Sequence, residues 1–294
     1  MMNYDEMQDC AEGAVGLMTP PENVLPERLD GAAAAVKPMT MKYDEMQDFF
    51  ERTLKLITPP VAVAFVRPDD ERPKGLTANI KPMTFCQAVT VARQGEYSLY
   101  LEKETLSCFN ARTTLGLGTA EDLQRDIEKS IETTIGKYAP NREIATKIVM
   151  SKFRIPAGSL KGLAVAPLGK ARFTPDCLIF TVFPWQAYYL TNAYLWMTGD
   201  IPLSFEVATN SLICGYGAGI AGWKKKINCC TACTGGRSYA GTESTEMYWA
   251  MPWELADTII EGLKGRSKKS PYPGLINIPL PAPAPEKHFF RTKA

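Results

Sequence analysis

The chain has 294 residues and a mass of 32.5 kDa, which suits one large domain or two of average size. Its 33 Lys and Arg residues nearly balance 32 Asp and Glu residues, and the resulting net charge of +1 is too small to attract it to nucleic acid or to an anionic membrane. No apolar run reaches the roughly 18 to 20 residues of a membrane span, and the N-terminus does not read as a signal peptide. We therefore expect a cytoplasmic protein that binds neither nucleic acid nor membranes.

The first 40 residues resemble an incomplete copy of the segment that follows. Residues 3–9 (NYDEMQD) return almost unchanged as residues 42–48 (KYDEMQD), but the first copy has no equivalent of the apolar run at 61–66. Without that run it cannot bury the surface that the second copy buries. We expect residues 1–40 to be a loosely ordered extension of a domain that spans residues 41–268.

Periodicity and turn residues predict alternating helices and strands in the first half of this domain. In chain order they predict a helix over 43–56, a strand over 61–66, a helix over 84–93, a strand over 97–102, a turn with Cys108, and helices over 120–138 and 142–153. Thr119 and Asp122 form a capping box that marks the start of the helix at 120.

The second half is predicted to repeat this order. It contains a hairpin-like pair of strands at 162–168 and 177–183, an apolar helix at 184–197, an extended segment at 202–207, and Cys214. The Gln-Ala pair at the start of the helix at 184 also occurs at Gln87 and Ala88. We interpret the chain as an α+β fold in which pseudo-duplicated strand–helix–strand units pack as one compact domain. In this interpretation Cys108 and Cys214 are equivalent.

The C-terminal part is predicted to form one last helix and a tail. The helix spans 252–264 and begins with a proline. Residues 269–294 are punctuated by prolines, and we expect them to run extended over the surface or over a second subunit. The tail is compatible with a homodimer.

The chemistry is limited by two counts, which are eight cysteines and a single histidine, His288, in the tail. Catalysis that depends on histidine is therefore nearly excluded. In a reducing compartment, cysteines serve as core residues, metal ligands or redox groups more often than as disulfides. The counts indicate a cysteine site but do not name a reaction.

The densest signal is the segment 228–237 (NCCTACTGGR), in which Cys230 and Cys233 form a C-x-x-C pair. A structural zinc site usually takes two such pairs, and only one is present. A thioredoxin-like dithiol lies in apolar surroundings, whereas three lysines at 224–226 precede this pair. An iron–sulfur cluster tolerates irregular spacing and gains from glycine-rich backbone whose N–H groups face the sulfurs. The third interpretation fits best.

The predicted cluster ligands share a position at a helix start or a strand-end turn: Cys86, Cys108, Cys214 and Cys233. A single free cysteine is more often a core residue, but four in corresponding turns favour a site. We assign Cys177, which lies inside an apolar strand, to the core. Cys229 and Cys230 are spare thiols or a separate redox pair.

Residues next to these cysteines are candidates for contact with a cofactor or an anionic substrate: Gly235, Gly236, Arg237 and Arg112. Solvated surface charge is the simpler explanation for either arginine. The segment 217–222 matches G-x-G-x-x-G, yet the long helix that a dinucleotide-binding fold requires does not follow. We expect a glycine turn close to a cluster or ligand.

Taken together, these motifs resemble a family known as domain of unknown function 169 (DUF169), which is widespread in archaea and anaerobic bacteria. The resemblance covers about residues 43–265 and rests on the order of residues 60–65, 85–88, 107–108, 115–117, 233–237, Glu246 and Pro252. It implies family cysteines at Cys86, Cys108 and Cys233, and the family's frequency in anaerobes agrees with an oxygen-sensitive cluster. Cys229 and Cys230 depart from the family pattern and leave open which clustered cysteine is the ligand.

Three functional hypotheses follow. The leading one is a single four-iron, four-sulfur cluster on the four predicted cysteines, used for electron transfer with a redox partner protein or for reduction of a small anionic molecule. The second is a non-catalytic module that holds a metal such as zinc, or an organic ligand, for delivery or sensing. The third is a metal-free dithiol oxidoreductase that uses Cys230 and Cys233.

Overall fold

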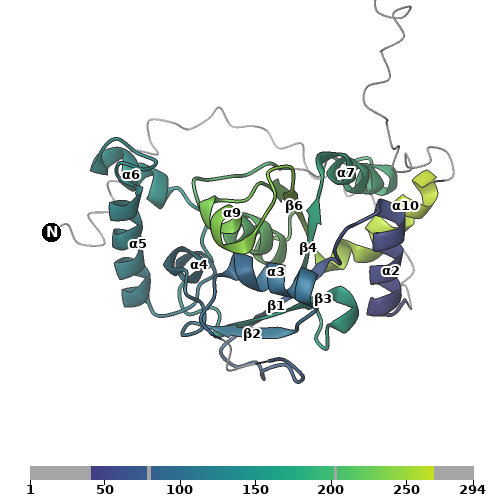
Figure 1. The fold of residues 1–294 in the computed structure, drawn as a ribbon, viewed down its shortest axis with the longest axis horizontal. Coiled ribbons are helices and arrows are strands. Elements are labelled where there is room, and N and C mark those ends of the chain that lie inside the picture. Colours follow the sequence, from purple (N-terminus) through teal and green to yellow (C-terminus); the bar gives the residue numbers. More distant parts are fainter. Residues whose placement is uncertain (1–40, 78–80, 202–203, 268–294) are drawn as a thin grey trace, which may run out of the picture. The chain divides into compact units, whose positions relative to one another are not determined.

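The computed structural model describes residues 41–77, 81–201 and 204–267. The predicted extension 1–40 and the predicted tail 269–294, with His288, lie outside the described residues. Within them, helices cover both faces of one antiparallel sheet (Figure 1). The predicted α+β class is therefore confirmed.

The described strands form a six-stranded sheet in the order β2-β3-β1-β4-β6-β5, and all neighbours are antiparallel. The strands are β1 (Val61–Val66), β2 (Leu99–Glu102), β3 (Gly162–Pro167), β4 (Cys177–Val182), β5 (Asn228–Cys230) and β6 (Met247–Pro252). The four longest, β1, β3, β4 and β6, form the centre of the sheet, and the two short strands lie at its edges. Short edge strands offer little unpaired backbone to other chains.

The sheet consists of two halves with the same topology. In each half the third strand lies between the first and the second, giving the order β1-β3-β2 on one side and β4-β6-β5 on the other. The registers also match: Val61 pairs with Pro167, and Cys177 pairs with Pro252. Each of these two prolines leads into a short 3-10 helix, η1 (Leu168–Lys170) or η3 (Trp253–Leu255). The strands are thus a structural duplication.

The predicted hairpin between the strands at 162 and 177 does not form. β3 pairs with β1 and β2, whereas β4 pairs with β1 and β6, so β1 lies between them. All six residues of β1 are buried, and a strand without a solvent-facing side chain is suited to the middle of a sheet. The connection through η1 therefore crosses the end of β1.

Alternating side chains divide the core between the two faces of the sheet. One face, which we call the cysteine face, carries Val63, Val165, Ile179 and Tyr248. The helical elements packed on it are α3 (Phe85–Gly95), α4 (Phe109–Thr114), the π-helix η2 (Leu212–Gly219), α8 (Ile220–Trp223) and α9 (Thr234–Ala240). In Figure 1, α3 and α9 lie side by side in front of the strands.

The opposite face is covered by three helices, α2 (Tyr43–Leu54), α7 (Pro184–Thr198) and α10 (Ala256–Ser267). They bury Phe180 and Trp249, whose rings make an edge contact at 5.7 Å. The helices α3 and α7 start alike, because Gln87 and Gln186 each accept a hydrogen bond from the N-cap backbone. They nevertheless cover opposite faces, so the Gln-Ala motif repeats a helix start and not a position in the fold.

A helical hairpin, α5 (Ala120–Thr134) and α6 (Arg142–Met150), packs beside α4 and has its own small core. Both helices are shorter than predicted. The chain leaves α5 at Ile135, where it is extended, and turns at Gly136, where φ is +73°. After α6, the guanidinium of Arg154 donates to the carbonyl oxygens of Val149 and Met150 and so caps the helix end.

Two further predictions near the C-terminal half are wrong. Pro252 ends β6 and does not begin the last helix, which starts at Ala256. The predicted extended segment at 202–207 forms only an isolated bridge between Ser204 and Asn228 within its described residues. The strands β5 and β6 were not predicted, because residues 228–230 were interpreted as part of a cysteine site and Pro252 as the start of a helix.

Candidate functional site: a four-cysteine cluster on one face of the sheet

Two of the predicted cysteines lie on helical segments between the first and second strands of each half. Cys86 is in the first turn of α3, where Thr84 accepts from the N–H of Gln87 and caps the helix. Cys214 lies inside the π-helix η2, which Ser211 begins with φ at +62°. Single π turns within helices are rare overall, but those that occur are often found at functional sites. Both thiols face the same core.

The other two cysteines follow the edge strands and precede a helix. Cys108 comes after β2 and is the N-cap residue of α4, whereas Cys233 comes after β5 and is the N-cap residue of α9. The duplication therefore makes Cys108 equivalent to Cys233 and not, as predicted, to Cys214. In each half, one cysteine comes from the helix before the edge strand and one from the helix start after it.

The four thiols are electrostatic neighbours of one another. The Cys86 thiol donates a hydrogen bond to Cys233, which raises the pKa of Cys86 and lowers that of Cys233 to about 5. Backbone N–H groups of Gly235, Gly236 and Leu212 also face the Cys233 sulfur and act in the same direction. Burial raises the pKa of Cys108 and Cys214, and each of them also senses Cys233. The structure thus brings the four predicted ligands together.

The cluster lies just below the surface. Cys86, Cys214 and Cys233 are buried, and Cys108 is partly exposed. Among the described residues, no three His, Cys, Asp or Glu side chains are arranged to hold one metal ion.

Cys177 and Cys229 have other surroundings, whereas Cys230 lies beside the cluster on the same face of the sheet. Cys177 lies in the core as predicted, and its thiol donates to the carbonyl of Ala218 at 3.7 Å. Cys229 and Cys230 point to opposite faces of the sheet, because they are consecutive residues of β5. Burial raises the pKa of Cys229 to about 12, and the Cys230 thiol donates to the carbonyl of Leu212. The charge of Cys233 also raises the pKa of Cys230, but the thiol hydrogen-bonded to Cys233 is that of Cys86.

A buried lysine near the cluster was missed by the sequence analysis. Lys152 is 6% exposed and donates to Asn210 Oδ1 at 2.6 Å. Burial, with the charge of Arg154, lowers its pKa to about 8, while Cys214, Cys108 and Cys233 act against that shift. No spacing in the sequence pointed to it, since it is 44 residues after Cys108 and 62 before Cys214 (152 − 108 and 214 − 152).

Comparison with known proteins identifies the family of this chain. A family model described as DUF169, an uncharacterised ArCR family, matches residues 50–262, which include all four cysteines. The chain belongs to this family. An uncharacterised protein of Methanocaldococcus jannaschii is 24% identical over 208 residues, which cover 69% of this chain and 86% of that protein. No solved structure matches.

In this DUF169 protein, the predicted cofactor-contacting residues divide into two groups. Gly235 and Gly236 lie in α9 and direct their N–H groups at Cys233. Arg237 is exposed and forms no ion pair with a described residue. Arg112 pairs with Asp126 at 3.4 Å and donates to the carbonyl of Leu106, so it holds α4 against α5. Of the two arginines, only Arg237 has its charge available.

The glycine motif at 217–222 does not form the predicted turn. It lies within η2 and α8, and all six residues are buried. A Cβ atom on Gly219 would come within 2.6 Å of Phe153, and one on Gly222 within 2.7 Å of Phe65. The glycines therefore let these helices approach their neighbours closely, and no dinucleotide-binding fold is present.

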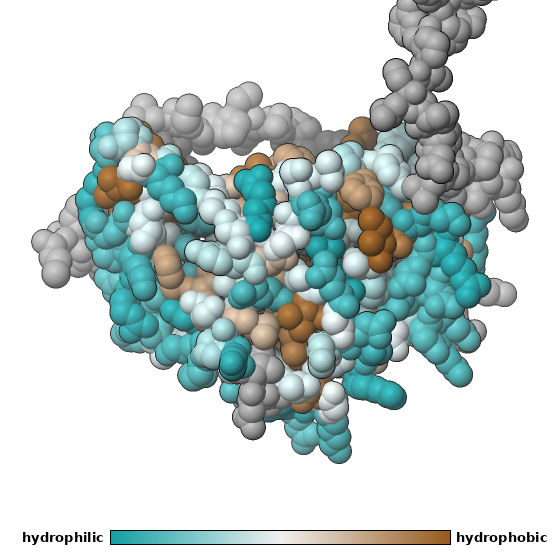
Figure 2. All heavy atoms as spheres, viewed as in Figure 1, coloured by the Kyte–Doolittle hydropathy of each residue, from teal (hydrophilic) through white to brown (hydrophobic). Residues whose placement is uncertain are grey.

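None of the helices between residues 41 and 267 is long and apolar enough to cross a membrane. On the face in Figure 2, hydrophilic residues predominate and hydrophobic ones are scattered. This mixture is consistent with the balanced charge of the sequence.

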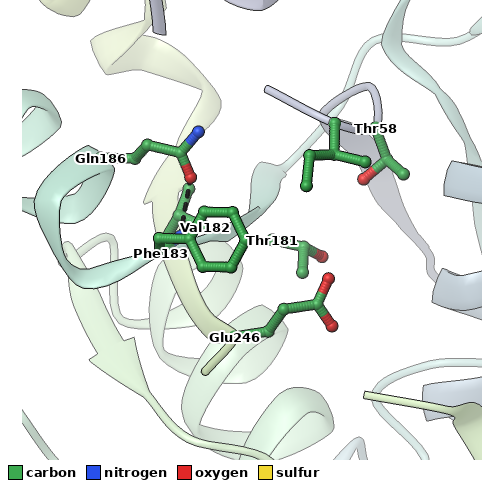
Figure 3. A pocket seen from close by; sticks show the side chains of 7 residues that line it. Thr58, Thr181, Val182, Phe183, Gln186 and Glu246 are labelled. Carbon is green, nitrogen blue, oxygen red and sulfur yellow. Dashed lines mark hydrogen bonds between the residues drawn. The ribbon is translucent and has the colours of Figure 1, made fainter. Parts of the chain in front are cut away.

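A small hollow between β4 and the end of α2 contains no cysteine (Figure 3). Gln186 there is satisfied by Phe183 and by the carbonyl oxygens at the end of α2, and Glu246 accepts from Arg93. The polar groups of the hollow therefore stabilise the fold, apart from the Thr181 hydroxyl, which has no partner among the described residues. The hollow is not a candidate active site.

The hydrogen bond from Cys86 predicts an unusual pH dependence for protein prepared free of metal. Iodoacetamide should alkylate Cys233 with a rate that is half-maximal at about pH 5 and falls below it, because acid protonates the thiolate. Replacing Cys86 by alanine should move that midpoint to higher pH, and Cys177 should remain unlabelled. Peptide mapping by mass spectrometry gives the rates. A wild-type midpoint near 9.0, the ordinary value for a thiol, would refute this assignment.

Proposed function

We propose that this protein binds an iron–sulfur cluster through Cys86, Cys108, Cys214 and Cys233 and uses it in electron transfer or in the reduction of a small anionic molecule. The observation that carries the proposal is the convergence of four thiols from four separate elements onto one face of the sheet. The remaining described cysteines are hydrogen-bonded elsewhere or lie on the opposite face.

The donor set suits such a cluster better than a single ion. Iron–sulfur clusters prefer four thiolates and bind each one through a different iron, so their ligands need not share one point. The thiol hydrogen bond between Cys86 and Cys233 would be replaced by two iron–thiolate bonds on binding. The thiolate of Cys233, already favoured by three backbone N–H groups, is the first ligand to which iron would bind.

Hydrogen bonds and burial would also set the properties of a bound cluster. Reduction potentials of clusters depend on N–H groups that face the sulfurs and on exposure to solvent. Here N–H groups face Cys233, and those of Asn110 and Ala111 face Cys108. Partly exposed Cys108 provides the shortest route for an electron to a partner protein, and exposed Arg237 provides a charge for an anionic substrate or an acidic partner.

The test is reconstitution without oxygen. Protein incubated with iron and sulfide and then desalted should retain a broad absorption band at about 400 nm that bleaches on reduction with dithionite. A parallel sample incubated with zinc tests the delivery or sensing alternative. Retention of zinc together with failure to retain iron would reject the cluster in favour of a mononuclear site.

A second candidate function rests on the contact between two thiols. Because Cys86 and Cys233 are hydrogen-bonded, a metal-free dithiol would use this pair in preference to the predicted pair Cys230 and Cys233. Thiol–disulfide exchange would pass two electrons to a disulfide substrate: the Cys233 thiolate attacks one sulfur and releases the first thiolate, and the Cys86 sulfur, after losing its proton, attacks the mixed disulfide and releases the second. The result that would identify this dithiol function is redox activity that survives complete removal of metal and disappears in the Cys86→Ala variant.

A further inference from the structure

Lys152 lies in a segment that links the two halves of the cysteine site. The backbone N–H of Phe153 donates to the hydroxyl of Tyr216 in η2 at 3.3 Å. The N–H of Ile155 donates to the carbonyl of Thr114 in α4 at 2.9 Å. The segment is therefore held between the helix that carries Cys214 and the helix that begins after Cys108.

The ammonium group of Lys152 has only a neutral partner. It donates to Asn210 Oδ1 at 2.6 Å, and among the described residues it forms no ion pair with a carboxylate. A buried ammonium normally has an opposite charge, because desolvation of an unpaired ion is costly. The groups of opposite charge that it senses are the thiolate forms of Cys214, Cys108 and Cys233.

We propose that Lys152 is the charge-compensating residue of the cysteine site and raises the reduction potential of the cluster bound there. This inference rests on the proposed function. A four-iron cluster with four thiolates has a negative net charge, which grows by one on reduction. A fixed positive charge in a buried site stabilises the reduced form more than the oxidised form. Asn210 holds the ammonium in place and is a positioning residue.

Three variants of the full chain test this role after reconstitution with iron and sulfide. Lys152→Met keeps the length of the side chain and removes its charge, whereas Lys152→Arg keeps the charge. Lys147→Met removes an exposed lysine from α6, the helix that precedes Lys152. The readouts are iron per chain and the midpoint potential from a spectroscopic redox titration.

We expect Lys152→Met to have a lower midpoint potential than wild type, and Lys152→Arg and Lys147→Met to stay close to wild type. Equal potentials for Lys152→Met and wild type at equal iron content would overturn the proposal. If Lys152→Met does not fold, Asn210→Leu is the deciding variant. It keeps the ammonium group of Lys152 but removes the side chain that holds it in place, so it should lower the midpoint potential by less than the loss of the charge would. An absence of iron in reconstituted wild type would instead contradict the proposed function itself.

Discussion

Replacing Cys233 by serine is expected to lower the iron retained after anaerobic reconstitution by at least about tenfold. Changes to residues that only support a metal ligand commonly cost about 10 to 100-fold in affinity, and a direct ligand should cost no less. Cys233 combines a hydrogen bond from Cys86 with three backbone N–H groups, so its loss removes the thiolate that the site stabilises most. Iron per chain, measured after desalting, gives the result.

The matched control is Cys229→Ser. Cys229 is four residues earlier and is also buried, but it lies on the opposite face of the sheet with α2, α7 and α10. The Cys229→Ser variant should retain as much iron per chain as the wild-type protein. Equal losses of iron in the two variants would mean that general destabilisation and not ligation explains the effect, and full retention in Cys233→Ser would exclude this residue as a ligand.

The second large effect concerns stability. Arg93 on α3 forms a two-point ion pair with Glu246, at 2.9 and 3.1 Å, and their side chains are 2% and 12% exposed. Replacing Glu246 by alanine leaves a buried guanidinium without its counter-charge, and its Nε already has no partner among the described residues. We expect the free energy of unfolding to fall by about 3 to 5 kcal/mol.

Two further variants test whether the loss of stability comes from leaving Arg93 buried without its partner and not simply from removing a carboxylate. Glu143→Gln breaks an exposed pair with Lys147 and should change the stability little. The double variant Arg93→Met with Glu246→Leu removes both charges and should recover much of the loss. Equilibrium unfolding in urea measures all three variants. A loss below about 1 kcal/mol in Glu246→Ala would show that the ion pair contributes little to the fold.

The positions of three of the four cysteines could be predicted because the local signals are strong, whereas Cys214 lies inside a π-helix and not at the predicted turn. Cys86 follows a proline and a capping threonine, Cys108 and Cys233 precede short helices, and such starts depend on residues within a few positions. The strand at β1 was predicted for the same reason, since its six apolar residues form one uninterrupted run.

Pairing between distant segments could not be predicted from the same signals. β3 and β4 are close in sequence and both fully buried, and nothing local shows that β1 lies between them. The equivalence of Cys108 with Cys233 depends on that strand order, which is why the sequence alone pointed to an equivalence of Cys108 with Cys214. Likewise, only the alternation in β5 shows that Cys229 and Cys230 face opposite sides of the sheet.

Lys152 shows a third limit of the sequence. It is placed by contacts of its neighbours with Tyr216 and Thr114, which are 64 and 38 residues away from it (216 − 152 and 152 − 114). A lysine after a helix is usually a solvated charge, and only its burial reveals another role.

The most direct test of the cysteine site is the content of iron and acid-labile sulfide in protein expressed and purified without oxygen. The account predicts about four of each per chain, with the visible band that accompanies them. Protein that contains neither iron nor sulfide under these conditions, and that takes up none on reconstitution, would contradict the account and leave the thiols themselves as the chemistry.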